Sequence, residues 1–254
     1  MFKHWPCLAI LMVVLAAPAA YADNDFTVLD ANVAATRNAA AKEGWQGSAT
    51  LGYVATTGNT NTRSLNARAL AAYRLGNWAN ALSFQALQGS TNGVTSSESY
   101  DFNGQSDYSL TASNYLFGSV DYLRNTFASY RRRTTEVVGV GWRVLATNTQ
   151  QVDIELGGGA RQTHFTDNTS ETEFIEHLAA GYLWKFTDKS NFSETLTLDH
   201  GAFNTYLQSV TALTTNLAGN FALALSYTIN NNSHPLSTFK HTDTVTSVSL
   251  VYTF

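Results

Sequence analysis

The 254-residue sequence contains only three prolines. Pro6 and Pro18 lie close to the amino terminus, so Pro235 is the one proline in the rest of the chain. Proline cannot donate a hydrogen bond to a β-ladder and is rare inside sheets. Its scarcity is therefore compatible with a chain that consists almost entirely of paired strands.

Cysteine is nearly absent as well, since Cys7 is the only one. It lies before an apolar run near the amino terminus and not after it, which excludes a lipoprotein acylation site. We expect Cys7 to be removed with a signal peptide. The mature chain then has no disulfide, no thiolate metal site and no cysteine nucleophile.

Charged residues are scarce at 13%, while aromatic residues make up 12% of the chain. A water-soluble surface normally carries more charge than this. Loss of Lys3 with the signal peptide would reduce 15 basic residues to 14 against 19 acidic ones, a net charge of about −5. This balance argues against nucleic acid as a partner.

Long hydrophobic runs are missing too. The longest, residues 7–17, is too short to cross about 30 Å of hydrocarbon as a helix, and no later segment has 18 consecutive apolar residues. This run follows the basic Lys3 and precedes a small-x-small site that ends at Ala22. These features predict a cleaved signal peptide over residues 1–22 and an exported protein.

Residues 23–43 are the one segment without an alternating pattern. Asp30 is placed to cap a short, alanine-rich helix that Gly44 would end. Such a helix would either plug the mouth of a barrel or lie in the periplasm, and its weak amphipathicity favours the periplasm. The chain thus divides into residues 1–22, 23–43 and 44–254.

From Gly44 onward, apolar and polar residues alternate in segments separated by turn residues, as in a half-buried antiparallel strand. In the clearest segment, aromatic residues such as Tyr100 and Phe102 alternate with Asp101, Asn103, Gln105 and Asp107. The pattern predicts an all-β, up-and-down transmembrane β-barrel. Its twelve expected strands are 45–57, 62–75, 78–88, 99–110, 114–125, 133–144, 151–165, 172–186, 190–200, 205–217, 221–230 and 243–254.

Alternation alone does not distinguish an outer-membrane barrel from a soluble, lipocalin-like one with its apolar face inside. Three features favour the membrane barrel. Tight connections alternate with longer polar ones such as 89–98, and twelve strands would leave a soluble barrel with an unfilled interior. In addition, four tryptophans fall near one expected membrane interface: Trp45, Trp78, Trp142 and Trp184.

The chain ends on an aromatic residue in a strand pattern, with Val248, Leu250, Tyr252 and Phe254 on one face. This ending resembles the C-terminal signal of bacterial outer-membrane barrels, through which the assembly machinery would act. Together with the Gly-Tyr and Thr-Gly-Asn-Thr elements of residues 44–61, the Val-Tyr-Thr-Phe ending is similar to the salt-induced outer-membrane protein family, a β-barrel domain of unknown function. The resemblance implies an outer-membrane location and contact with outer-membrane lipid and lipopolysaccharide, but no cofactor or catalytic residue.

Polar residues on the other strand faces are expected to line the lumen. They suggest a small passive channel or a protein that stabilises the envelope under osmotic or salt stress. Asp153 and Glu155 share one face at acid–base spacing, but Arg143 should lie opposite Asp153 if Val144 faces Val152, which favours an ion pair. The expected lumen residues are Arg68, Arg74, Asp101, Asn103, Gln105, Asp107, Arg143, Asp153, Glu155 and Arg161.

A lipid hydrolase is the alternative function. Glu176 should lie opposite His200 near the outer rim, with Ser209 or Thr205 on the next strand, an acid, histidine and hydroxyl set that resembles an outer-membrane phospholipase. Polar residues in the headgroup zone are the simpler interpretation, and we expect no enzyme.

Two further groups bear on ligands. Glu173 and His177 would lie about 13 Å apart on one strand, too far to share a metal. Residues 131–133, three consecutive arginines at the outer rim, would either hold lipid phosphates or form a solvated charge run.

Overall fold

The computed structural model describes residues 43–56, 62–125, 129–236 and 239–254. The predicted signal peptide and nearly all of the predicted helical segment lie outside these residues. Among the described residues, no helix is long and apolar enough to cross a membrane.

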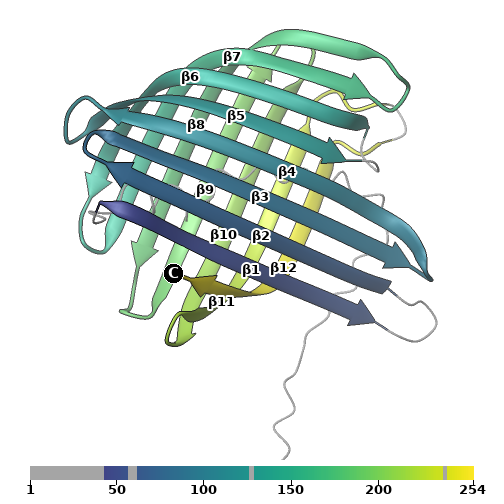
Figure 1. The fold of residues 1–254 in the computed structure, drawn as a ribbon. Helices are drawn as coiled ribbons and strands as arrows, with labels where there is room; N and C mark the ends of the chain where they lie inside the picture. Colours follow the sequence, from purple (N-terminus) through teal and green to yellow (C-terminus); the bar gives the residue numbers. More distant parts are fainter. Residues whose placement is uncertain (1–42, 57–61, 126–128, 237–238) are drawn as a thin grey trace, which may run out of the picture.

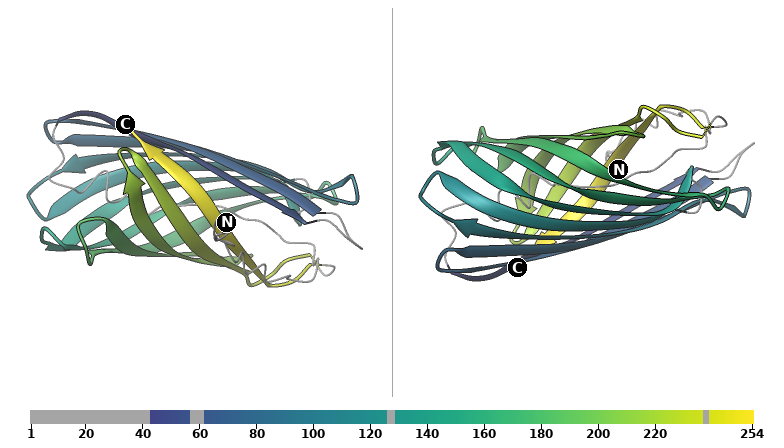
Figure 2. Two further views of the ribbon diagram at one scale, coloured as in Figure 1. Left: turned by 90° about the horizontal axis from the view of Figure 1, so that it is seen from below. Right: turned by 90° about the horizontal axis from the view of Figure 1, so that it is seen from above.

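The described residues form twelve antiparallel strands, each paired with its sequence neighbours, and β1 pairs with β12 to close the barrel (Figure 1). Figure 2 shows the strands as walls that face each other across the barrel. The strands are β1 (Gly44–Thr56), β2 (Thr62–Leu75), β3 (Trp78–Thr91), β4 (Val94–Ser109), β5 (Asn114–Asn125), β6 (Tyr130–Ala146), β7 (Gln150–Phe165), β8 (Ser170–Lys185), β9 (Ser190–Gly201), β10 (Thr205–Ala218), β11 (Phe221–Asn232) and β12 (Thr242–Thr253).

The two ends of the barrel differ. The terminal end holds Gly44, Phe254 and the turns that follow the even-numbered strands, and the loop end holds the other connections (Figure 1). Three turns of the terminal end share a threonine, at positions 111, 147 and 187, whose Oγ1 accepts hydrogen bonds from the amides two and three residues later. These bonds satisfy backbone amides of turns that contain no glycine.

The connection between β3 and β4 differs from the prediction of a polar loop over residues 89–98. Both strands continue past that point and end in a two-residue turn, with Asn92 at φ 51° and Gly93 at φ 81°. Consecutive positive φ values at Asn-Gly are those of a tight hairpin turn. A register shift at Gly89 absorbs the extra residue, so the hairpin extends the barrel wall at the loop end.

The exterior is apolar and the interior polar. Large hydrophobic side chains are exposed along every strand, including all four tryptophans of the predicted girdle, of which Trp45 is 73% exposed. Aromatic neighbours pack against them at the terminal end, with ring centroids 4.9 Å apart in both Trp45–Tyr73 and Trp78–Tyr108. A surface of this kind is stable against acyl chains and not against water. The barrel is therefore transmembrane, and the lipocalin-like alternative is wrong.

The seam between β1 and β12 is the shortest boundary of the barrel. Its Cα pairs run only from Ser48↔Thr253 to Leu51↔Leu250. Beyond them, Gly47 and Phe254 exchange two backbone hydrogen bonds, each of 3.0 Å. Val248, Leu250, Tyr252 and Phe254 are all exposed on the exterior face.

Removing Phe254 is expected to lower the yield of closed barrel, because it removes two of the few bonds that hold the seam. Each such bond contributes about 1 kcal/mol net. The folded fraction can be measured after refolding in detergent from the heat-dependent mobility of the barrel on gels. Phe221→Ala is the control, since it removes a ring that packs against Tyr252 at 5.0 Å but leaves the seam bonds in place. Equal folded fractions for both variants would contradict the prediction.

Candidate functional site: the lumen

The lumen contains the polar faces of the strands and is the candidate site. The structure buries seven of the residues that we predicted to line it: Asp101, Asn103, Gln105, Asp107, Asp153, Glu155 and Arg161. The other three, Arg68, Arg74 and Arg143, are half-buried. All ten lie on the strand faces that alternate with the apolar exterior.

Glu155 on β7 is the centre of one network. Its Oε1 accepts hydrogen bonds from the hydroxyl of Tyr115 on β5 (2.9 Å) and from Nε2 of Gln105 on β4 (3.0 Å). The same Gln105 amide also donates to Asp107 at 3.0 Å. Three strands are thereby joined through one carboxylate.

Arg143 lies near this network. It is opposite Asp153 in the register, as predicted, but a register shift follows it and places Leu145, not Val144, opposite Val152. The extra residue is accommodated by the shift, which the sequence pattern does not reveal. The guanidinium lies 5.0 Å from the ring centroid of Tyr115 and donates to the carbonyl of Ala112 at 3.3 Å. The ion pair with Asp153 remains a prediction.

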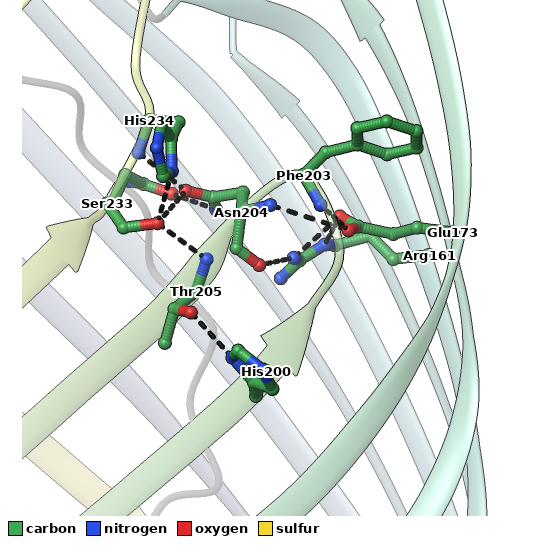
Figure 3. A network of polar contacts seen from close by, with 9 residues as sticks. Arg161, Glu173, His200, Phe203, Asn204, Thr205, Ser233 and His234 are labelled. Atoms are coloured by element: carbon green, nitrogen blue, oxygen red, sulfur yellow. Dashed lines mark hydrogen bonds and ion pairs between the residues drawn. The ribbon is translucent and has the colours of Figure 1, made fainter.

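A second network lies at the loop end (Figure 3). Arg161 on β7 donates to Glu173 Oε1 on β8 through Nε (2.9 Å) and Nη2 (2.7 Å), and both side chains are almost fully buried. Nη2 also donates to the carbonyl of Asn204 in the β9–β10 turn. The other carboxylate oxygen accepts the amide of Phe203 at 2.8 Å. At Gly201 a Cβ would overlap this carboxylate, so glycine lets it approach the turn.

The same turn is tied to the end of the neighbouring strand β11 and to the residues that follow it. Asn204 accepts the backbone amide of His234 at 3.0 Å and donates to the side chain of Asn232 at 3.1 Å, while the Thr205 amide donates to Ser233 at 2.8 Å (Figure 3). A cavity of about 20 Å³ lies among the side chains of this network. We call Arg161, Glu173 and Asn204 the mouth lock.

Two other interior contacts were missed by the sequence reasoning. His177 Nδ1 and Asp199 Oδ1 lie 2.6 Å apart, directly opposite each other on β8 and β9. Arg133 on β6 lies 4.6 Å from the ring centroid of Tyr206 on β10, a contact between strands that are not neighbours. The predicted pairing of Glu176 with His200 already implied the first contact, because one register fixes both.

The lumen wall formed by β10–β12 and β1–β3 is different. A cavity of about 100 Å³ lies along it, lined mainly by serine, threonine and alanine, with Arg68 as its charged residue. It leads toward a cavity of about 510 Å³ at the terminal end that shares Ser48, Thr214 and Val251 with it. We call the small polar residues of this wall the hydroxyl track: Ser48, Thr50, Thr214, Ser226, Ser247 and Ser249.

The residues of the hydrolase alternative come together only in part. Glu176 and His200 are opposite each other, as predicted. However, Ser209 donates to Glu194 Oε1 at 2.7 Å, and the His200 ring bonds Thr205 at 2.8 Å. Ser209 lies four residues along β10 from Thr205, about 13 Å away. The hydrolase is not supported.

Within the described part of the chain, no three His, Cys, Asp or Glu residues cluster as a metal site would require. Glu173 and His177 each bond a different partner, Arg161 and Asp199.

A family model described as a protein of unknown function, DUF481, matches residues 49–254. The chain belongs to this DUF481 family. An uncharacterized Escherichia coli K12 protein, YdiY, is 34% identical over 235 residues, which cover 92% of this chain and 90% of YdiY.

Solved structures agree on the architecture. The translocator domain of the autotransporter NalP from Neisseria meningitidis is 13% identical, with a TM-score of 0.51 over 88% of this chain and 92% of the domain. At this identity the likeness concerns the fold alone. An outer-membrane channel from Pseudomonas putida F1 is 11% identical, with a TM-score of 0.49 over 85% of this chain and 97% of that chain. The closed twelve-strand barrel and its lipid-compatible exterior are those of an outer-membrane β-barrel, and this DUF481 protein has both.

Proposed function

We propose that the protein is a narrow, passive channel of the outer membrane. The observation that carries this proposal is the unequal division of the lumen. Charged side chains pack across one wall, whereas the hydroxyl track lines a cavity along the other. Buried charges fixed by hydrogen bonds narrow the lumen, and the small side chains opposite them leave the remaining space.

The chemistry of the track indicates its solutes. Serine and threonine hydroxyls both donate and accept hydrogen bonds, so they can replace water around a small polar solute. Arg68 adds positive charge beside the track. We therefore expect small neutral or anionic solutes to pass and large or cationic ones to be excluded.

A second candidate, an envelope-stabilising protein, is favoured by the mouth lock. The lock encloses a cavity of only about 20 Å³ and ties three hairpins together at the loop end. A barrel that is permanently closed in this way would carry no solute and would act through its stability. A role under salt stress would be part of this second, envelope-stabilising function.

Conductance across a planar bilayer tests the channel. The refolded protein should give steps that scale with salt concentration, and Ser226→Trp should lower them about tenfold or more, because an indole would fill the track. Leu225→Trp is the matched control, since it places the same ring on the neighbouring, lipid-exposed position. A silent wild-type protein would overturn the channel and favour the stabilising role. If steps are seen, equal conductance of the two variants would show that the solute path does not follow the hydroxyl track.

A further inference from the structure

A row of basic side chains crosses the outer face of the barrel at the loop end. Arg124 on β5 is opposite Arg132 on β6, which is opposite His164 on β7. Together with Arg131 and Tyr122 they line a cavity of about 370 Å³ beside the β7–β8 turn. We call this cavity the basic rim pocket.

The local backbone explains why two of the three consecutive arginines face outward. The β6–β7 register shifts between Tyr130 and Arg132, so Arg131 occupies the irregular position. Arg131 and Arg132 are both exposed, while Arg133 turns inward and is 3% exposed. The bulge thus places a second guanidinium on the exterior where strict alternation would allow one.

The pocket contains positive charge without a matching carboxylate. Arg132 Nη2 lies 3.3 Å from His164 Nε2, and His164 Nδ1 lies 2.7 Å from the hydroxyl of Ser170. A guanidinium can only donate, so Nε2 is the acceptor in this contact. No ion pair joins Arg124, Arg131 or Arg132 to an acidic residue in the parts of the chain that the structure describes.

The nearest acidic groups are used elsewhere or lie farther away. The Asp167 carboxylate accepts the Thr169 hydroxyl (2.6 Å) and amide (2.9 Å), and these bonds hold the pKa of Asp167 below its ordinary value. Glu136 lies four residues from Arg132 along β6, about 13 Å away. Like charges opposite each other on adjacent strands destabilise a sheet, so an anion in the pocket would relieve the repulsion.

The position of the pocket indicates which anion this is. The next exterior row toward the terminal end begins with Tyr122 opposite Thr134, and the row after it contains Val120, the exposed Glu136 and the exposed Phe174. The basic row therefore lies at the loop-end edge of the largely apolar exterior, next to an aromatic residue. In an outer membrane this is the level at which phosphates of the outer leaflet lie above their acyl chains.

We propose that the basic rim pocket binds a phosphate of the phosphorylated glycolipid of the outer leaflet, the lipid A part of lipopolysaccharide. Arg124, Arg131 and Arg132 donate to the phosphate oxygens, and paired N–H groups of a guanidinium match them bidentately. The acyl chains lie along the apolar exterior below the pocket. The site is on the outside of the barrel and does not depend on a conducting lumen.

Binding of lipid A to the purified, refolded protein in detergent tests the proposal. Bisphosphorylated lipid A should bind the wild type, and lipid A without phosphates should bind far more weakly. Arg124→Gln with Arg132→Gln should weaken binding of the phosphorylated form about 30-fold, from about fivefold per arginine near an anionic surface. Arg63→Gln is the matched control. Arg63 is an exposed arginine on β2, also at the loop end of the barrel, and it lies outside the pocket.

Three results would overturn the proposal. The first is equal binding of phosphorylated and dephosphorylated lipid A to the wild type. This comparison uses the wild-type protein alone, so it does not depend on the folding of a variant. The second is competition by inorganic phosphate at an affinity equal to that of lipid A, which would assign the pocket to a free anion. The third is an equal loss of lipid A binding in the Arg63→Gln control and in the variant that combines Arg124→Gln with Arg132→Gln.

Discussion

Arg161→Ala is expected to lower the free energy of unfolding by about 3 kcal/mol or more and to open the loop-end mouth. The substitution leaves the Glu173 carboxylate buried without its cation, and breaking one partner of a buried pair costs about 3–5 kcal/mol. The amide of Phe203 still donates to the carboxylate, which places the expected loss at the lower end of this range. Urea titration of the barrel in liposomes would measure the stability, and conductance would measure the opening.

Two variants separate the lock from general effects of the substitution. Arg161→Met combined with Glu173→Met should recover most of the stability, because a pair of apolar side chains of similar size leaves no buried charge. Arg63→Ala removes an exposed arginine at the same end of the barrel and should change the stability by less than about 0.5 kcal/mol. If Arg161→Ala has the same free energy of unfolding and the same conductance as the wild type, the mouth lock neither stabilises the barrel nor restricts its loop end.

Gly159→Ala should prevent folding or destabilise the barrel by about 3 kcal/mol or more. A Cβ at this position on β7 would overlap the backbone carbonyl oxygen of Glu136 on β6. Backbone atoms of a neighbouring strand cannot rotate away as a side chain does, so the strands would have to separate and lose hydrogen bonds. The folded fraction after refolding and the urea midpoint of any folded material would measure the effect.

Gly118→Ala provides the matched control on β5. Its Cβ would meet Val138 at 3.9 Å, an ordinary contact, so this variant should fold like the wild type. Equal behaviour of the two alanine variants would mean that β6 and β7 do not approach as closely at Gly159 as the structure places them.

Alternation of side chains, together with the strand number and the positions of the tryptophans, was sufficient to predict the fold. Because the strand period is two, the exterior aromatic residues fix where every inward residue points, and Tyr100, Phe102 and Tyr108 assign Asp101, Asn103 and Asp107 to the lumen side. The errors lie where the period is interrupted. The β3–β4 hairpin is longer than predicted because polar residues continue to pair beyond the apolar band, and the irregularity after Arg143 shifts Val144 out of its expected pairing.

Contacts within the lumen were predictable only where they join adjacent strands. Arg161 lies directly opposite Glu173, and His177 lies opposite Asp199, so counting from the turns would have found both pairs. Gln105 with Glu155 and Arg133 with Tyr206 join strands that are not neighbours. Such contacts depend on how strongly the sheet curves, which side-chain alternation does not encode.

The short seam has a consequence for the bilayer. β1 is paired with β2 along its whole length, from Gly44↔Arg74 to Thr56↔Thr62, but its pairs with β12 stop at Leu51↔Leu250. We therefore expect the barrel wall to open locally most often between the loop-end halves of β1 and β12, because the fewest backbone hydrogen bonds have to break there. Ser249 of the hydroxyl track lies beside Gly52 of β1 at this boundary, so separation of the two strands here would expose the track to the hydrocarbon core.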